Sequence, residues 1–262
     1  MPILRIGIGT GNLQQPLKKA LHTAAKVGAQ GIEIDARNVL RPSELSETGR
    51  RQLRKMLDDL NLQVAAVRFN TRRGYDVADD LDRRMEATRE ALRFAYSLGA
   101  STVINSIGRV DEDLDAPTNQ QLIACLEDIA RWGQHIGAML ACETGNEPVD
   151  RLAQLLDRLR YQTIGVAFNP GNLIINGWYD STSIEVVGPR VLTVIARDAV
   201  RDLARGRGLE VPLGDGTADF PHILATLEQF DYRGWIIADR QRSDDLEYDL
   251  SNAVKYLRAI QQ

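Results

Sequence analysis

The sequence predicts a (β/α)8 barrel formed by a single domain over residues 1–262. Short, apolar, β-branched runs recur along the chain, and segments with helical periodicity separate them. From residue 3 to residue 234, the starts of the eight runs lie 33 residues apart on average, which is the length of one strand-and-helix unit. No Pro- or Ser-rich linker interrupts this alternation, so one domain is favoured over two.

Each apolar run is typical of a parallel strand that is buried on both faces. The eight runs comprise residues 3–9, 31–34, 62–69, 101–107, 138–142, 163–168, 191–196 and 234–238. Between them, residues such as Leu17, Ala20, Leu21 and Ala24 show the three- and four-residue spacing of an amphipathic helix. Several helices are expected to end at a left-handed cap just before the next strand, at Gly28, Gly99 and Gly137.

An open Rossmann sheet is the competing fold. Gly7, Gly9 and Gly11 follow the first strand and Asp35 ends the second, as a dinucleotide site would require. The fingerprint, however, needs its third glycine at position 12, which is Asn12. We therefore interpret the glycines as a tight turn out of the first strand.

The composition excludes several classes of partner. The chain has 36 acidic and 32 basic residues, a formal charge of −4, so no global basic field exists to hold nucleic acid or an anionic membrane. No apolar run approaches the roughly 18 residues of a membrane span, and we expect no export signal, because the first residues lack a basic segment followed by an apolar one. We expect a cytoplasmic protein with a small-molecule substrate. A homo-oligomer is left open, because no self-complementary patch is visible in the sequence.

In a barrel of this kind the chemistry lies at the carboxyl ends of the strands. The site candidates found there are Glu33, Arg68, Asn105, Glu143, Asn169, Asn172, Arg197, Asp239 and Arg240. Alternate strand residues face the barrel interior. Glu143 shares a face with Ala141, and Asp239 shares one with Ile237, so small apolar residues below and polar ones above fit an inward register. The same parity holds at the ends of the sixth and seventh strands.

Six segments of these strand ends and loops carry a resemblance to a known family. They are Gly-Ile-Glu-Ile-Asp at 31–35, Ala-Cys-Glu-Thr-Gly-Asn at 141–146, Val-Ala-Phe-Asn-Pro-Gly-Asn at 166–172, Val-Ile-Ala-Arg-Asp at 194–198, Val-Pro-Leu-Gly-Asp-Gly at 211–216 and Tyr-Arg-Gly-Trp-Ile-Ile-Ala-Asp-Arg at 232–240. In this order and spacing, the chain resembles the sugar phosphate isomerase/epimerase family, whose barrel is xylose-isomerase-like. The resemblance covers nearly the whole chain.

The resemblance implies a divalent metal held by Glu, Asp, His and Glu from strands five to eight, with both glutamates moving a proton beside a carbonyl. Glu143 matches the first glutamate, whereas the next positions hold Asn169, Ile195 and the shorter Asp239. Asn172 stands where many members place a substrate-binding histidine. We expect a degraded site without a tightly bound cofactor, at which Glu143 and Asp239 hold Mg²⁺ or Mn²⁺ weakly at most. The chain's histidines lie in predicted helices or at their ends: His22, His135 and His222.

Two functions follow from this resemblance and from the substituted residues. The first is a sugar or sugar-phosphate isomerase or epimerase in which Glu143 and Asp239 act as acid and base, and Arg197 holds the oxyanion. The second is a non-catalytic barrel that binds a carbohydrate or an acidic metabolite. The remaining candidates are expected to bind substrate: Glu33, Arg68, Asn105, Asn169, Asn172 and Arg240.

Two further features are interpreted structurally. The glycines of Leu-Gly-Asp-Gly at 213–216 could expose amides to a phosphate, but Asp215 would repel it, so a tight turn is favoured. Trp235, within the last strand, is expected either at the mouth or against the outer helices.

Overall fold

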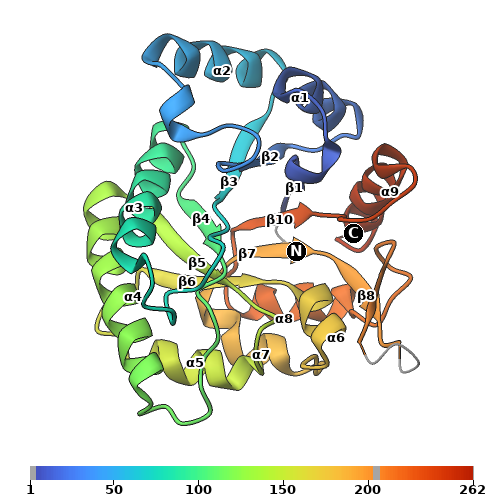
Figure 1. Ribbon diagram of the computed structural model, residues 1–262. Coiled ribbons are helices and arrows are strands. Elements are labelled where there is room, and N and C mark those ends of the chain that lie inside the picture. The colour runs from blue at the N-terminus through green and yellow to red at the C-terminus, as the bar shows by residue number, and fades with distance from the viewer. Residues whose placement is uncertain (1–3, 203–206, 262) are drawn as a thin grey trace.

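A closed barrel of eight parallel strands forms the centre of the computed structural model, which describes residues 4–202 and 207–261 (Figure 1). The strands follow the order β1-β10-β7-β6-β5-β4-β3-β2 around the barrel. Their bounds are β1 Arg5–Gly9, β2 Gly31–Asp35, β3 Gln63–Arg68, β4 Thr102–Asn105, β5 Met139–Glu143, β6 Ile164–Phe168, β7 Val191–Ala196 and β10 Trp235–Ala238. The predicted barrel is confirmed, and residue 3 of the first predicted run lies outside the described residues.

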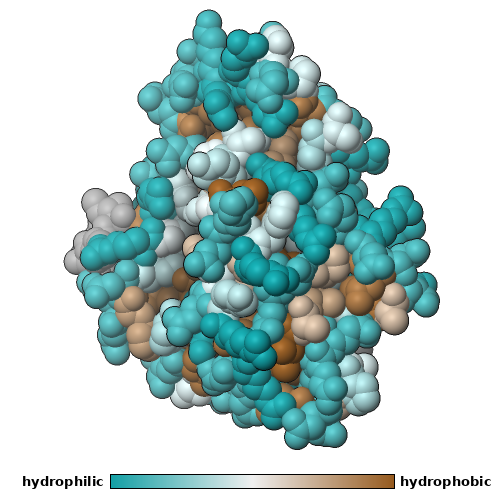
Figure 2. Space-filling view, turned by 90° about the vertical axis from the view of Figure 1, so that its left-hand side faces the viewer, coloured by the Kyte–Doolittle hydropathy of each residue, from teal (hydrophilic) through white to brown (hydrophobic). Residues whose placement is uncertain are grey.

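Helices surround the strands and bury their apolar faces against them. Their bounds are α1 Leu17–Lys26, α2 Glu47–Asp59, α3 Leu81–Ser97, α4 Pro117–Ile136, α5 Val149–Asp157, α6 Pro170–Asn176, α7 Ser183–Val187, α8 Phe220–Gln229 and α9 Leu246–Ala259. Gly28, Gly99 and Gly137 have φ values of 84°, 80° and 87°, as left-handed helix caps require. No helix of the described chain is long and apolar enough to cross a bilayer. The face in Figure 2 is mostly hydrophilic, with hydrophobic residues in small separate groups.

The barrel interior has a core of its own, distinct from the core under the helices. It contains Ala65, Ala66, Ile104, Ala141, Ala167, Ile195, Trp235 and Ile237. Ala141, Ala167, Ile195 and Ile237 are therefore inward-facing, as the parity predicted, and the polar residues two positions later follow them at the carboxyl ends. The expected placement of Trp235 at the mouth or against the outer helices is wrong. Trp235 lies inside the barrel at its amino end, where Arg5 Cζ is 4.4 Å from the centroid of its ring.

A short hairpin that the sequence pattern did not predict follows β7. Its antiparallel strands are β8 Asp198–Val200 and β9 Leu209–Val211. The carboxylate of Asp198 accepts hydrogen bonds from the backbone N–H groups of Ala199, Gly214, Gly216 and Ala218 at 2.8 to 3.1 Å. The glycine turn at 213–216 thus wraps around a side chain of the protein itself, which agrees with its interpretation as a tight turn.

Candidate active site

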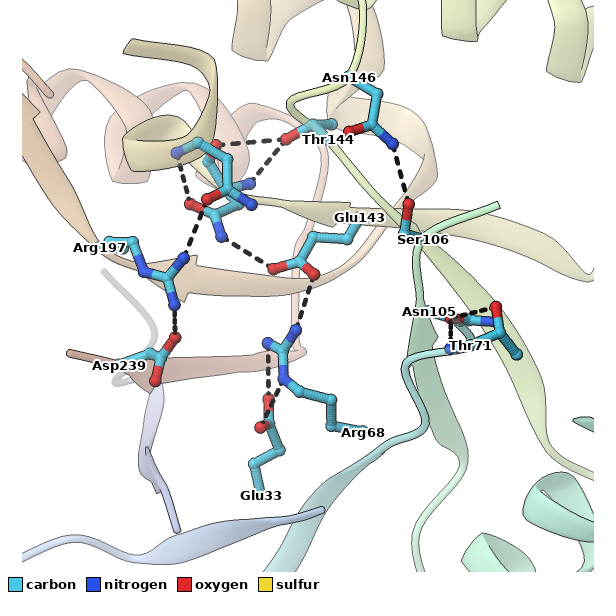
Figure 3. A network of polar contacts seen from close by, with 12 residues as sticks. Glu33, Arg68, Thr71, Asn105, Ser106, Glu143, Thr144, Asn146, Arg197 and Asp239 are labelled. Atoms are coloured by element: carbon cyan, nitrogen blue, oxygen red, sulfur yellow. Dashed lines mark hydrogen bonds and ion pairs between the residues drawn. The ribbon is translucent and has the colours of Figure 1, made fainter. Parts of the chain in front are cut away.

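Arg68, the last residue of β3, joins two carboxylates across the barrel mouth (Figure 3). Its Nε and Nη2 donate to Oε1 and Oε2 of Glu33 at 2.7 and 3.0 Å, and its Nη1 donates to Oε2 of Glu143 at 2.7 Å. Only 11% of the Arg68 side chain and 9% of the Glu143 side chain are exposed. This cation therefore compensates two nearly buried acids and fixes the orientation of Glu143.

Asn169 holds the other oxygen of Glu143. Its Nδ2 donates to Glu143 Oε1 at 2.8 Å, while its Oδ1 accepts from the backbone N–H of Asn172 at 3.0 Å. The second bond caps α6, whose first residue is Pro170. Because the cap uses the oxygen, the amide nitrogen of Asn169 is the atom that faces the mouth.

Arg197 occupies the opposite side of the mouth, between β7 and the hairpin. Its Nη1 donates to Asn172 Oδ1 at 2.9 Å, its Nη2 pairs with Asp239, and its Nε lies 3.4 Å from Glu210 Oε1. The other oxygen of Asp239 accepts from Asn12 at 3.0 Å. Only 4% of the Arg197 side chain is exposed, so protein groups surround this guanidinium.

Two glycines make room for these side chains. A Cβ on Gly9 would lie 3.0 Å from Asp239 Oδ1. A Cβ on Gly171 would lie 2.6 Å from Arg197 Cγ and 2.9 Å from its carbonyl oxygen. Gly171 is thus required by the close approach of α6 to the residue after β7, whereas Gly9 leaves space for a carboxylate rather than for a phosphate.

The structure joins seven of the nine candidates in one chain of contacts. In order around the mouth they are Glu33, Arg68, Glu143, Asn169, Asn172, Arg197 and Asp239. The other two lie apart. Asn105 is fully buried, and it accepts from Thr71 N at 3.1 Å and donates to the Tyr75 hydroxyl at 2.8 Å. Arg240 contacts Asp249 of α9 at 3.1 Å and Glu210 at 3.7 Å. Both anchor loops at the rim.

Glu210 and Gln241 are site neighbours that sequence reasoning missed. Glu210 lies in the unpredicted hairpin, and it accepts from the backbone N–H of Gln241 at 3.0 Å. In its hydrogen-bonding orientation, the Gln241 amide oxygen lies 3.0 Å from Arg197 Nη2. The available signal was the alternation Leu209, Glu210, Val211, a lone acid between apolar residues.

The pKa values of the two buried acids Glu33 and Asp239 are shifted from their ordinary values in opposite directions. Burial raises the pKa of Glu33, and the Arg68 guanidinium only partly opposes this. Burial acts in the same sense on Asp239, but Arg197, Arg68 and the hydrogen bond from Asn12 bring its pKa below the ordinary value. Asp239 is consequently a carboxylate at neutral pH.

The residues at the implied metal positions do not fit a tightly held dication. Glu143 and Asp239 each pair with a guanidinium, Asn169 presents a nitrogen, and Ile195 packs in the barrel interior. A cation about 4 Å from an arginine meets a repulsion of roughly 4 kcal/mol per unit charge at an effective dielectric of 20. Within residues 4–202 and 207–261, no three His, Cys, Asp or Glu side chains are grouped to hold a metal. The three histidines lie on α1, α4 and α8.

Two known proteins are similar to this chain over most of its length. The rhizopine catabolism protein MocC of Rhizobium meliloti is 23% identical, over 91% of this chain and 78% of that protein. The inosose dehydratase of Clostridium beijerinckii is 20% identical, over 95% of this chain and 90% of that protein.

Solved structures show the same fold. A xylose isomerase domain protein from Planctomyces limnophilus matches with a TM-score of 0.87 and 22% identity, over 99% of this chain and 98% of that one. A xylose isomerase-like TIM barrel protein from Mycobacterium smegmatis, solved in complex with magnesium, matches with a TM-score of 0.80 and 17% identity, over 98% and 96%. A D-tagatose 3-epimerase-like protein matches with a TM-score of 0.78 and 15% identity, over 98% and 97%.

The family model described as xylose isomerase-like TIM barrel matches residues 21–260, which is most of the chain and includes seven of the eight barrel strands. The strand order, the inward register and the polar mouth all agree with this match. The chain therefore belongs to the xylose isomerase-like TIM barrel family.

Proposed function

We propose that this protein is an enzyme that moves a proton at the carbon beside a carbonyl group of a sugar or a related keto-polyol. The names of its relatives support this substrate class, since they include an inosose dehydratase and a D-tagatose 3-epimerase-like protein. Dehydration and epimerisation next to a ketone share this proton transfer as an elementary step. The product type, isomer, epimer or dehydrated ketone, depends on which group then receives the proton.

The placement of Glu143 carries the proposal. Arg68 and Asn169 each donate to one of its oxygens, which holds the carboxylate in one orientation at the mouth. Glu143 takes the proton from the carbon, the C–H electron pair forms the C=C bond, and the carbonyl π pair moves to oxygen. The resulting enediolate then recovers a proton at carbon from Glu143, which returns to its carboxylate form. Asp239, kept ionised by Arg197, carries the hydroxyl proton between the two substrate oxygens.

We assign the oxyanion to a donor other than Arg197, the residue expected from the sequence. The three nitrogens of Arg197 already face Glu210, Asn172 and Asp239, so we assign Arg197 a positioning role. Asn172 uses only its Oδ1 in this contact, and its Nδ2 has no hydrogen bond to the described residues. This amide hydrogen is the donor we assign to the developing oxyanion. Mg²⁺ or Mn²⁺ would first have to displace a guanidinium.

Hydrogen exchange in the substrate tests the proton transfer directly. The protein is incubated in D₂O with a panel of ketoses and inososes, and deuterium entry beside the carbonyl is followed by NMR. Glu143→Gln keeps the size of the side chain but cannot accept the proton, so we expect exchange to fall at least about 100-fold. Glu90→Gln, an exposed change on α3, is the matched control. Exchange by Glu143→Gln at the parental rate would refute the assignment.

A ligand-binding barrel without catalysis is the second candidate. It is favoured by the internal pairing of charges at the mouth, because five of the six guanidinium nitrogens of Arg68 and Arg197 donate to protein acceptors and the sixth, Arg197 Nε, lies 3.4 Å from Glu210. A mouth of this kind is stable without substrate. Under this alternative, a sugar or acidic metabolite would raise the melting temperature of the protein, yet no deuterium would enter any bound ligand.

A further inference from the structure

A basic groove of about 520 Å³ borders the barrel mouth, outside the network described above. Its charged lining consists of Arg37, Arg72, Arg73, Arg83, Arg84 and Asp80. We call it the arginine groove. Five cations face one acid there, although the whole chain carries a formal charge of −4.

The groove is built from the loops that follow β2 and β3 at the carboxyl end of the barrel and from the first turns of α3, which supply Arg83 and Arg84. Phe69 and Thr71, which line it, lie one and three residues after Arg68, the last residue of β3. Thr71 is fixed by its backbone bond to Asn105 at the end of β4, at 3.1 Å. Arg37 follows β2 and donates to the carbonyl of Asn70 at 2.6 Å. The groove therefore lies next to Arg68, whose Nη1 donates to Glu143.

Most of this positive charge is not neutralised by carboxylates. Arg73 pairs with Asp79 at 2.8 Å. Arg84 donates only to backbone carbonyls, those of Val77 and Asp79, and its Nε is buried without a partner. Arg72 and Arg83 make no hydrogen bond or ion pair with the described residues, although both line the groove. Two guanidinium groups are thus free to bind an external anion.

The shape and the charge indicate a small anion. Guanidinium groups bind phosphate and carboxylate oxygens in pairs of hydrogen bonds. A concave volume of about 520 Å³ is in the range of small-molecule sites, and the acidic chain as a whole disfavours a polyanion. We propose that the arginine groove binds the phosphate of a phosphorylated sugar, whose carbonyl end lies at Glu143. The placement of that carbonyl end rests on the proposed function, whereas phosphate binding by the groove does not.

Calorimetric titration with inorganic phosphate, fructose 6-phosphate, fructose and gluconate tests the proposal. The key variant is Arg72→Gln with Arg83→Gln, two exposed residues whose loss breaks no internal contact of the described chain. We expect phosphate and fructose 6-phosphate to bind the parent, and the double variant to bind them about 100-fold more weakly, which is about tenfold per arginine. Added salt should also weaken binding. Arg51→Gln with Lys55→Gln removes the same charge from α2, and it should bind like the parent.

Each result has a defined meaning. Equal phosphate binding by the parent and the groove variant would overturn the proposal, as would equal losses in the groove and α2 variants. Gluconate binding without phosphate binding would overturn the choice of phosphate over carboxylate. Glu143→Gln separates the two proposals. If this variant still exchanges deuterium at the parental rate, the proposed function is refuted. If phosphate binding is nevertheless lost only in the groove variant, the groove assignment stands.

Discussion

Asn169 has two polar atoms in its side chain, and the fold uses both. The oxygen caps α6, and the nitrogen holds Glu143. An aspartate at this position would keep one oxygen for the cap and offer the second to a cation, whereas the amide offers a donor. One atom at one residue therefore changes the mouth from a cation-binding surface to one that orients carboxylates.

Arg68 is expected to be the most costly single residue to remove from the mouth. Arg68→Met leaves Glu33 and Glu143 nearly buried without a countercharge, so the free energy of unfolding should fall by about 3–5 kcal/mol. Urea denaturation measures this. Arg41→Met, which breaks an exposed pair with Glu44 and an exposed hydrogen bond to the Arg37 carbonyl, is the control and should cost no more than about 1 kcal/mol. Equal losses in the two variants would contradict the role of Arg68.

Sequence reasoning could predict which mouth residues face inward, but not which groups they pair with. Parity along each strand is local, and it correctly grouped Glu143 and Asp239 with the interior residues Ala141 and Ile237. Pairing depends on positions far apart in the chain: Arg68 and Glu143 are 75 residues apart, and both lie at strand ends that only the closed barrel brings together. The expected oxyanion role of Arg197 depended on such a pairing.

At the scale of elements, the βα repeat explains why the barrel strands were predicted to within a few residues. Each strand is an apolar run that ends where its neighbours end. The hairpin of β8 and β9 has no such signal, because each strand has only three residues. The turn that follows β9 is held by the Asp198 carboxylate, which accepts from amides 16 to 20 residues away, and no local pattern in the sequence indicates that contact.

Asp198 should control the order of the turn that follows this hairpin. Asp198→Ala leaves the amides of Gly214, Gly216 and Ala218 without their acceptor, which should cost at least about 3 kcal/mol of unfolding free energy. Amide hydrogen exchange of residues 209–218 should become faster than in the parent, while that of α3 is unchanged. Asp215→Ala, exposed in the same turn, is the control. Unaltered exchange over 209–218 would show that other contacts hold the turn.

Glu147 is expected to make the stability of the fold depend on pH. It precedes α5, is 3% exposed and accepts from the backbone N–H of Val110 at 3.2 Å. Burial raises its pKa to about 7. Because the folded pKa is above the ordinary 4.5, this group's stabilising contribution is complete below pH about 4.5 and is lost as pH rises through about 7.

Glu147→Gln should remove this dependence. The amide keeps an oxygen for Val110 and never ionises, so the variant should match the parent near pH 4 and exceed it above pH 8. The shift from 4.5 to about 7 corresponds to about 3 kcal/mol. Urea unfolding across this pH range measures the difference. A constant difference at every pH would mean that Glu147 does not titrate in this range.

At the scale of the whole molecule, paired charges and unpaired cations occupy separate regions at one end of the barrel. The inner mouth holds acids compensated by Arg68 and Arg197, and the arginine groove beside it holds uncompensated cations. The residues of the mouth and of the groove lie at the carboxyl ends of parallel strands, in the loops that follow them or in the first turns of α3, so the barrel topology brings them to the same end. A ligand with a polyol at one end and an anion at the other matches this arrangement.

The same distribution of charge predicts how the whole protein responds to metals. Dialysis against EDTA should leave the melting temperature unchanged, and Mg²⁺ or Mn²⁺ should not raise it, because a dication must displace a guanidinium from Glu143 or Asp239. In Arg68→Met, Glu33 and Glu143 lose their shared cation, so Mn²⁺ should raise the melting temperature of this variant and restore part of its lost stability. The arginine and the metal would then be alternative occupants of one position between two carboxylates. A stoichiometric metal in the purified parent, removed only by chelation with a fall in melting temperature, would show that the network rearranges around an ion.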